Sequence, residues 1–513
     1  MRRPVFLLFL AAACSQTPKP PDPHFPAKFL FGTAIAGFQA DMGCPTIPAA
    51  QCEDPNSDWY QFVTDPRILA QKDSLGVSGD PPSAGPGFYE LYPEDLARVK
   101  NEAKLNAVRL SIEWSRIFPT STVGVEGYDA LKAIASPEGI AYYHRIFAKM
   151  KQLGLTPLVT LNHYTLPTWV SDGVGCHFDF QHCTRRGWLD PSTQTEIAKY
   201  AGFVAQEYGG EVDLWATENE PLAVVLAGYL EPSPERTNPP ALSYQAKAAK
   251  AVTLALIAAH AKMYDAVKAG DKEDADGDGK DSEVGLVYNL GPVVPADPTN
   301  DDDVTAAKNI FYLYDQLFLD ATIRGDLDEQ LDGHPTHHPE LAGRMDYLGL
   351  NYYTRITVAG WNQETLPDFS PLLTIDPNST KTNFNETYPR GLYEMVKFAS
   401  SRYHLPIIIT ENGASADPAK HGEDQRQFFA EHLQWLKRAI DEGADVRGYF
   451  WWTMMDNYEW NHGMGPYRFG LWAVDKTDPA KARTKRPLVD DFARLATTRE
   501  IPADLAAKYP IGK

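Results

Sequence analysis

One stretch decides the fold: Pro406-Ile407-Ile408-Ile409-Thr410-Glu411-Asn412-Gly413, a β-branched apolar run that ends in polar residues and a glycine. A short apolar run bounded in this way predicts a buried strand. Seven comparable runs occur along the chain, and each is followed by a longer stretch with helical periodicity. The eight runs are residues 29–39, 107–114, 157–163, 214–220, 284–290, 346–353, 406–413 and 448–456. Repeated strand–helix units predict an α/β protein, and eight of them predict a single (β/α)8 TIM barrel with long βα loops.

The intervening helices are expected mainly at residues 140–153, 193–208, 241–269, 305–324 and 422–442. No change of composition marks a second domain, so residues 28–513 are expected to form one domain. The chain has 513 residues with 48 Lys and Arg against 68 Asp and Glu, a formal charge of −20. Such an acidic chain is repelled by phosphates, which excludes nucleic-acid partners. Its 43% hydrophobic and 23% charged residues exclude wholesale disorder and a polytopic membrane protein.

The N-terminus resembles a targeting segment. Arg2 and Arg3 precede a short apolar run at residues 5–13, which predicts a signal peptide over residues 1–13. Small residues lead into Cys14, the pattern of a bacterial lipoprotein in which that cysteine carries the lipid. Residues 14–27 contain five prolines and predict an extended spacer. We therefore expect an exported protein anchored to a membrane of the cell envelope by lipid alone, with a plain secreted protein as the alternative.

Four further cysteines suit an oxidising compartment. The simplest arrangement pairs Cys44 with Cys52 and Cys176 with Cys183, although four cysteines allow three connectivities. A zinc site that uses Cys176, Cys183 and the nearby His177 and His182 is the competing interpretation. We disfavour it because exported cysteines oxidise and this spacing is not a usual zinc-finger pattern.

Polar side chains stand at the carboxyl ends of most predicted strands. A barrel brings these ends to one face, where they line one pocket. The residues in question are Gln39, Glu113, His163, Asn219, Glu220, Asn351, Tyr353, Glu411, Asn412 and Asp456. A single residue of this kind is usually a cap or a loop residue, but the same coincidence at most of the eight strands favours a functional site.

Two of these acids, Glu220 and Glu411, follow strands that are expected to be buried, so an ionised carboxylate there needs a partner. Arg109 in the second strand is the candidate cation. Two facing carboxyls are what glycosidic cleavage requires, with one as proton donor and the other as support or nucleophile for the anomeric carbon. A separation of about 5 Å predicts retention of configuration, and about 6.5 to 9.5 Å predicts inversion.

The chain resembles glycoside hydrolase family 1, the retaining β-glucosidases and β-galactosidases. Residues 217–221 (TENEP) resemble the family's acid/base segment, and residues 410–413 (TENG) resemble its nucleophile segment. Residues 36–43 and 53–59 are most similar to the archaeal broad-specificity β-glycosidases of that family. Further matches lie at residues 109–119, 348–355 and 456–470, so the resemblance spans residues 25–475.

The resemblance implies a role for each matched residue. Glu220 is the general acid and then the general base, and Glu411 is the nucleophile. Arg109, Tyr353 and Asn351 orient the nucleophile. The implied sugar contacts are Gln39, His163, Asn219, Trp452, Glu459 and Trp460. The chain departs from the family at Tyr164, where most members carry Trp, and at Asn162, which replaces an aromatic residue. Glu459 would repel a phosphorylated sugar, so a neutral sugar is expected.

The implied activity is release of terminal β-D-glucosyl or β-D-galactosyl residues from a small oligosaccharide or an aryl or alkyl β-glycoside, with no metal or organic cofactor. Alternatives are a surface transglycosylase and an inactive carbohydrate-binding lipoprotein. Neither the oligomeric state nor the preferred sugar follows from the sequence. Asp274, Asp276, Asp278, Gly279 and Asp281 resemble a calcium loop, but Gly285 stands at its twelfth position. We interpret the loop as solvated, with structural calcium as the alternative.

Overall fold

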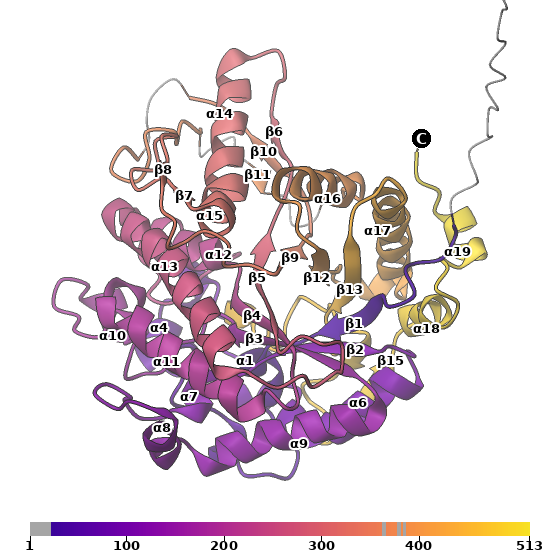
Figure 1. The fold of residues 1–513 in the computed structure, drawn as a ribbon, viewed down its shortest axis with the longest axis horizontal. Helices are drawn as coiled ribbons and strands as arrows, with labels where there is room; N and C mark the ends of the chain where they lie inside the picture. Colours follow the sequence, from indigo (N-terminus) through magenta and orange to yellow (C-terminus); the bar gives the residue numbers. More distant parts are fainter. Residues whose placement is uncertain (1–21, 362–365, 377–380, 383–385, 513) are drawn as a thin grey trace, which may run out of the picture.

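Eight parallel strands close into a barrel (Figure 1), as predicted. The computed structural model describes residues 22–361, 366–376, 381–382 and 386–512. The barrel strands are β1 (Leu30–Ala34), β2 (Ala107–Ser111), β3 (Thr156–Asn162), β4 (Leu214–Asn219), β5 (Glu283–Asn289), β9 (Tyr347–Asn351), β12 (Ile407–Asn412) and β13 (Val446–Trp452). Each strand pairs with its neighbours in chain order, and β13 closes the ring on β1.

Helices surround the barrel on its outside (Figure 1). The long ones are α6 (Phe88–Asn101), α9 (Pro137–Leu153), α11 (Pro191–Tyr208), α13 (Ala246–Gly270), α14 (Asp301–Phe311), α16 (Arg390–Tyr403), α17 (Glu423–Asp441) and α18 (Leu488–Thr498). Shorter α-helices are α1 (Gly37–Asp41), α2 (Ala49–Cys52), α3 (Asp58–Thr64), α4 (Pro66–Leu69), α5 (Lys72–Leu75), α7 (Trp114–Ile117), α8 (Tyr128–Ile134), α10 (Gly173–Phe178), α12 (Pro221–Val225), α15 (Leu317–Leu319) and α19 (Ala503–Lys508). The helix expected from residue 241 begins at Ala246, and the one expected over residues 305–324 is divided among α14, α15 and two π-helical turns.

Three small sheets lie in the loops outside the barrel. They comprise β6 (Val293–Pro295) with β10 (Ile356–Val358) and β11 (Lys381–Thr382), β7 (Asp326–Leu327) with β8 (Thr336–His337), and β14 (Trp472–Val474) with β15 (Arg483–Lys485). The first of these sheets joins the βα loops that follow β5 and β9. Strand pairing therefore joins the loop after β5 to the loop after β9, away from the barrel strands.

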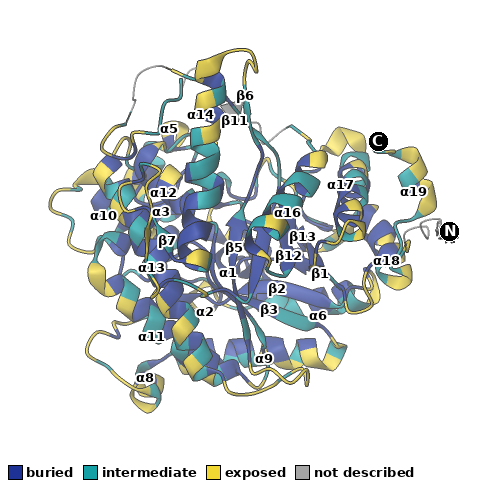
Figure 2. Cartoon of the chain, turned by 45° about the horizontal axis from the view of Figure 1, so that its top comes forward, coloured by how far each residue is buried: buried dark blue, intermediate teal, exposed yellow. Residues whose placement is uncertain are grey.

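The barrel strands are buried on both faces, as parallel strands covered by helices should be. Every residue of β2, β9 and β12 is buried, whereas exposed residues lie on the outer faces of the helices and in loops (Figure 2). Large side chains such as Trp215 and Trp451 are fully enclosed between strands and helices. This core holds the carboxyl ends of the strands in fixed positions.

The strand pairing is irregular at two strands that carry candidate catalytic residues. In β4 the register with β5 shifts between Ala216 and Asn219. In β12 the register with β9 shifts between Ile409 and Glu411. Irregularities of this kind interrupt the strict in–out alternation of a strand and re-aim the side chains that follow. Both predicted acids lie at the ends of these irregular segments.

Both predicted disulfides are present, one between Cys44 and Cys52 and the other between Cys176 and Cys183. The alternative zinc site is therefore wrong, because its sulfur atoms bond to each other. Its histidines have other partners. His177 Nδ1 lies 2.9 Å from the carbonyl oxygen of Pro240, and His182 contacts Asp179.

The predicted signal peptide (residues 1–13), Cys14 and the first part of the spacer lie outside the described residues. Within the end of that spacer, Phe25 is buried, and its amide donates to the carbonyl oxygen of Arg499 at 2.7 Å. Its ring packs against Phe29 and Phe31. The packed body thus begins slightly before residue 28. Among the described residues, no helix combines the length and apolarity needed to cross a membrane.

Candidate active site

Arg109 is the central residue of the site. It extends from β2, is 1% exposed, and its guanidinium donates to side chains from three other strands. Nη1 lies 2.6 Å from Glu411 Oε1, Nη2 lies 2.8 Å from Asn219 Oδ1, and Nε lies 2.9 Å from Thr160 Oγ1. A planar group with fixed donors holds three acceptors in one geometry. The predicted pairing of Arg109 with a strand-end carboxylate is present.

Glu411 lies at the end of β12 and is 4% exposed. Arg109 donates to one of its oxygens, and the hydroxyl of Tyr353 donates to the other at 2.7 Å. Burial raises the pKa of Glu411 to about 7, and the nearby charge of Glu220 acts in the same direction. The positive charge of Arg109 and the Tyr353 hydrogen bond oppose that rise. The carboxyl is thus a buried group whose ionised form depends on two specific donors.

Glu220 follows β4 and is only partly buried. Its Oε1 accepts from Asn351 Nδ2 at 2.9 Å and from Asn289 Nδ2 at 3.1 Å, and its Oε2 accepts from the Tyr164 hydroxyl at 2.5 Å. No cation forms an ion pair with it among the described residues. Glu220 and Glu411 therefore share one pocket but have different surroundings, neutral donors for the first and a guanidinium for the second.

Asn219 and Asn351 join the two acids. Asn219 Oδ1 accepts from Arg109 and, at 3.2 Å, from Asn351 Nδ2, while Asn351 also donates to Glu220. Asn351 Oδ1 accepts from the Thr410 hydroxyl at 2.8 Å, which fixes the orientation of that amide. A chain of hydrogen bonds thus runs from Glu411 through Arg109, Asn219 and Asn351 to Glu220. The sequence predicted both asparagines.

His163 and Gln39 each present a buried polar atom without a hydrogen-bond partner among the described residues. His163 Nε2 lies 3.0 Å from Asn219 Nδ2, an amide that donates, so the unpartnered Nδ1 carries the proton of a neutral ring. Burial lowers the pKa of His163 well below its usual range, and Arg109 and Arg236 add to this effect. Gln39 Nε2 donates to Glu459 Oε2 at 3.0 Å, and its Oε1 is unpartnered. These atoms are suited to ligand hydroxyls.

Aromatic rings complete the wall beside His163. The Trp460 ring stacks on the His163 ring with centroids 5.6 Å apart, and the Trp452 ring lies 5.8 Å from it. Burial raises the pKa of Glu459, the residue just before Trp460, to about 7, while Arg236 opposes the rise. The six residues predicted to contact sugar therefore gather around the two acids.

Two strand-end acids lie elsewhere, contrary to the expectation that all of them line one pocket. Glu113 is buried and accepts hydrogen bonds from the Phe38 amide and from Thr165, so it connects loops. Asp456 pairs with Arg486 at 2.7 Å. Both carboxylates are fully used in joining segments of the chain.

Three residues of the site were missed or misjudged from the sequence. Asn289 ends β5, the one strand whose end we had not considered, so its position was a usable signal. Tyr164 was treated only as a departure in the pocket wall. Arg236 lies in a loop with no periodicity, yet its guanidinium carbon is 5.1 Å from the Tyr164 ring centroid and 5.9 Å from that of Trp460.

Three residues of this pocket have backbones in the left-handed region, which non-glycine residues rarely adopt. They are Tyr164 (φ 72°), Glu220 (φ 43°) and Trp460 (φ 46°). Such conformations cost about 1–3 kcal/mol each and concentrate at functional sites. Glu220 also precedes Pro221, which begins α12, so its backbone turns sharply between strand and helix.

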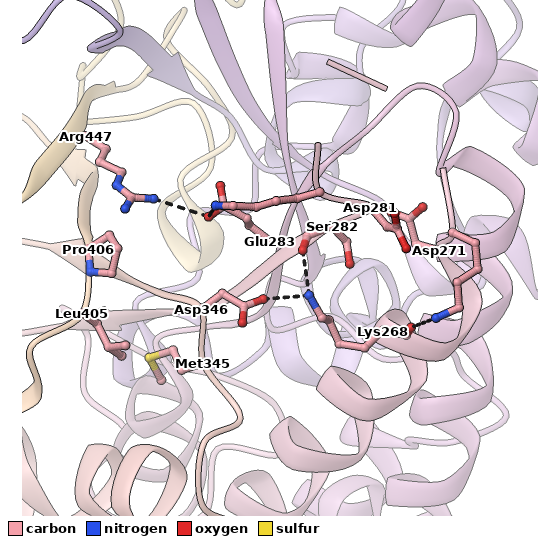
Figure 3. Close-up of a pocket in the computed structure, with 12 residues that line it drawn as sticks. Lys268, Asp271, Asp281, Ser282, Glu283, Met345, Asp346, Leu405, Pro406 and Arg447 are labelled. Carbon is pink, nitrogen blue, oxygen red and sulfur yellow. Dashed lines mark hydrogen bonds and ion pairs between the residues drawn. The ribbon is translucent and has the colours of Figure 1, made fainter. Parts of the chain in front are cut away.

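A separate hollow of about 520 Å³ lies at the opposite, amino-terminal ends of the strands (Figure 3). Two of its cations form ion pairs with lining carboxylates. Lys268 bonds Asp346 at 3.1 Å, and Arg447 reaches Glu283 at 3.4 Å. In barrels of this kind the catalytic residues lie at the carboxyl ends, whereas this end serves stability.

The acidic loop gathers differently from the predicted calcium set. Asp274 and Asp276 approach Asp213, with ligand atoms within 4.8 Å of one another, whereas Asp278 accepts the amide of Lys280 at 2.9 Å. Asp213 accepts from the amides of Ala275 and Asp276. Asp213 and the loop's own Asp278 thus accept hydrogen bonds from the backbone of the loop.

Comparison with known proteins places this geometry in a family. The family model described as glycosyl hydrolase family 1 matches residues 22–501. The chain belongs to glycosyl hydrolase family 1. The predicted family, the barrel fold and the class of enzyme are thereby confirmed, and the protein is a β-glycosidase that acts on glycosides.

The relatives of this family 1 enzyme include several archaeal proteins. A β-galactosidase of Pyrococcus woesei is 36% identical over 88% of this chain and 93% of its own length. A β-galactosidase of Saccharolobus solfataricus is 32% identical over 94% and 96%. Among solved structures, the β-glycosidase of the hyperthermophile Thermosphaera aggregans has a TM-score of 0.80 at 28% identity and covers 95% of this chain and 100% of its own.

Proposed function

We propose that the protein is a retaining, exo-acting β-glycosidase that removes terminal β-D-glucosyl or β-D-galactosyl residues by double displacement. The observation that carries the proposal is the contrast between two acids in one pocket. Glu411 is buried against Arg109 and Tyr353, and Glu220 is partly exposed among neutral donors. Environments that differ in this way separate the roles of two carboxyls.

In the first step, Glu411 attacks the anomeric carbon while Glu220 protonates the leaving oxygen. Arg109 and Tyr353 support this step, because both donors stabilise the ionised nucleophile and aim its oxygens. In the second step, Glu220 takes a proton from water, which attacks the glycosyl-enzyme and releases the sugar with its original configuration. Oxygen and proton balance in both steps without a further reactant.

The glycone is expected to lie between His163, Gln39 and the two tryptophans. The unpartnered Nδ1–H of His163 donates to a sugar hydroxyl, and the unpartnered Gln39 Oε1 accepts from another. Glu459, held by Gln39, accepts from hydroxyls and disfavours a phosphorylated sugar. The rings of Trp452 and Trp460 supply an apolar face.

Replacement of the nucleophile tests the proposal. Glu411→Gly should abolish turnover of an aryl β-glucoside and an aryl β-galactoside, by at least about 10³-fold, while the protein stays folded. Azide should restore activity and yield the α-glycosyl azide, because it enters from the face that Glu411 vacated. Proton NMR of the wild-type reaction should show the β-anomer first. Appreciable hydrolysis by the variant without azide, or the α-anomer as first product, contradicts the proposal.

A further inference from the structure

Tyr164 contacts the acid/base candidate Glu220 directly. Its hydroxyl oxygen lies 2.5 Å from Glu220 Oε2 and 3.1 Å from Asn219 Nδ2. The side chain is 5% exposed. Its ring contacts that of Trp460, with centroids 4.8 Å apart, and its centroid lies 5.1 Å from the guanidinium carbon of Arg236. The hydroxyl therefore has one fixed position relative to Glu220.

The directions of the hydrogen bonds follow from the surrounding network. Arg109 donates to Asn219 Oδ1, so the NH2 group of that amide faces Tyr164 and donates to its hydroxyl oxygen. The hydroxyl proton of Tyr164 therefore points at Glu220 Oε2. Oε1 of the same carboxyl accepts from Asn289 and Asn351. All three hydrogen bonds are donated to the carboxylate oxygens of Glu220, and a proton on Oε2 would displace the Tyr164 donation.

The charged and titratable groups around Glu220 act on it from several elements. They are Tyr164 after β3, Arg236 after α12, Tyr314 after α14, Tyr353 after β9, Glu411 on β12 and Glu459 after β13. Burial, followed by the charge of Glu220, raises the pKa of the Tyr164 phenol well above its usual range. The phenol therefore stays protonated and able to donate across the working pH of a glycosidase.

We propose that Tyr164 is a positioning residue that holds Glu220 and favours its ionised, general-base state, an inference that rests on the proposed function. Ionised Glu220 is the state needed when water attacks the glycosyl-enzyme. A tryptophan at this position has no hydroxyl that could donate to Glu220. The phenol therefore speeds the second step and narrows the pH range in which Glu220 retains the proton needed for the first.

Tyr164→Phe removes only the hydroxyl and tests the proposal. The basic limb of kcat/KM against pH for an alkyl β-glycoside should move up by about one pH unit, the effect of one hydrogen bond to a charged group. With a dinitrophenyl β-glycoside, whose first step is fast, kcat should fall about tenfold, and glycosyl-enzyme should accumulate in rapid-quench mass spectrometry. A purely structural role would lower the rate at every pH without moving the limb.

Tyr264→Phe is the matched control, because that hydroxyl also donates to a carboxylate, Asp346 Oδ1 at 2.8 Å, at the amino-terminal end of β9. Its pH profile should equal that of the wild type. Tyr164→Trp fills the space without a phenol, so its basic limb should also move up, even where the Phe variant folds poorly. The proposal is overturned if the limb stays in place in folded Tyr164 variants or moves equally in Tyr264→Phe. Azide rescue of Glu411→Gly tests the proposed function separately.

Discussion

Loss of Arg109 should move the acidic limb of the profile of kcat/KM against pH to higher pH. The side chain is 1% exposed, and its Nη1 lies 2.6 Å from Glu411 Oε1. Arg109→Met keeps much of the length and removes the charge, so buried Glu411 loses its cation. Glu411 must be ionised to act as the nucleophile, and loss of the cation raises its pKa. When the pH is lowered, the variant should therefore lose activity at a higher pH than the wild type does.

The size of this displacement follows from the burial of the pair. Removal of one partner of a buried ion pair costs about 3–5 kcal/mol, and one pKa unit corresponds to about 1.4 kcal/mol. Because Tyr353 still donates its hydrogen bond to Glu411, we take the lower end of this range, about 3 kcal/mol. That energy corresponds to a displacement of about two pH units. The pKa of Glu411, which burial raises to about 7, would then lie near 9. The ionised fraction at pH 7 falls from about one half to about one hundredth, and kcat/KM falls roughly fiftyfold.

The assay is kcat/KM for an aryl β-glucoside from pH 4 to 10, with circular dichroism to verify folding. Arg109→Lys is the control. It retains a charge near Glu411 but lacks the fork that also reaches Asn219 and Thr160, so its acidic limb should move less than that of the Met variant. A folded Met variant whose acidic limb coincides with that of the wild type would refute the assignment of Arg109 as the group that keeps Glu411 ionised.

Glu220→Ala should lose about 10²–10³-fold on alkyl β-glycosides and much less on dinitrophenyl β-glycosides, whose leaving group needs no proton; equal losses in steady-state and single-turnover assays would contradict an acid role. The N-terminal pattern leads us to propose an exported, lipid-anchored protein. Growth with a labelled fatty acid should label the wild type and not Cys14→Ser, and an unlabelled wild type in a bacterial host would contradict the anchor.

The barrel could be predicted because its signal is distributed over the chain. Eight apolar runs each repeat the same physical requirement, a strand buried on both faces, and errors of a few residues in any one of them leave the topology unchanged. The residues at the strand ends followed from the same rule, which is why Arg109, Asn219, Asn351 and Glu411 are found together. The two disulfides followed from the shortness of their loops.

The residues that the sequence did not predict depend on local departures from those rules. Tyr164 and Glu220 adopt left-handed backbones, and β4 and β12 shift register just before their acids. A strict alternation of side chains along β4 would not place Glu220, Asn219 and Thr217 as the structure has them. Thr217 faces His260 of α13, while Asn219 faces Arg109 inside the barrel. The hydrophobic periodicity of a sequence does not reveal such a change in the direction of successive side chains.

The same departures explain how one pocket obtains two different acids from nearly identical motifs, TENE at residues 217–220 and TEN at residues 410–412. Glu411 lies within the buried end of its strand, where Arg109 and Tyr353 are the described residues that donate hydrogen bonds to its carboxylate. Glu220 lies one residue beyond the strand, at a left-handed turn into α12, where it meets Tyr164 and solvent. The backbone strain at that turn costs about 1–3 kcal/mol, which the large core of the barrel can offset. The turn therefore leaves Glu220 partly exposed, where the proposed mechanism has it exchange a proton with water, while Glu411 stays buried against its cation.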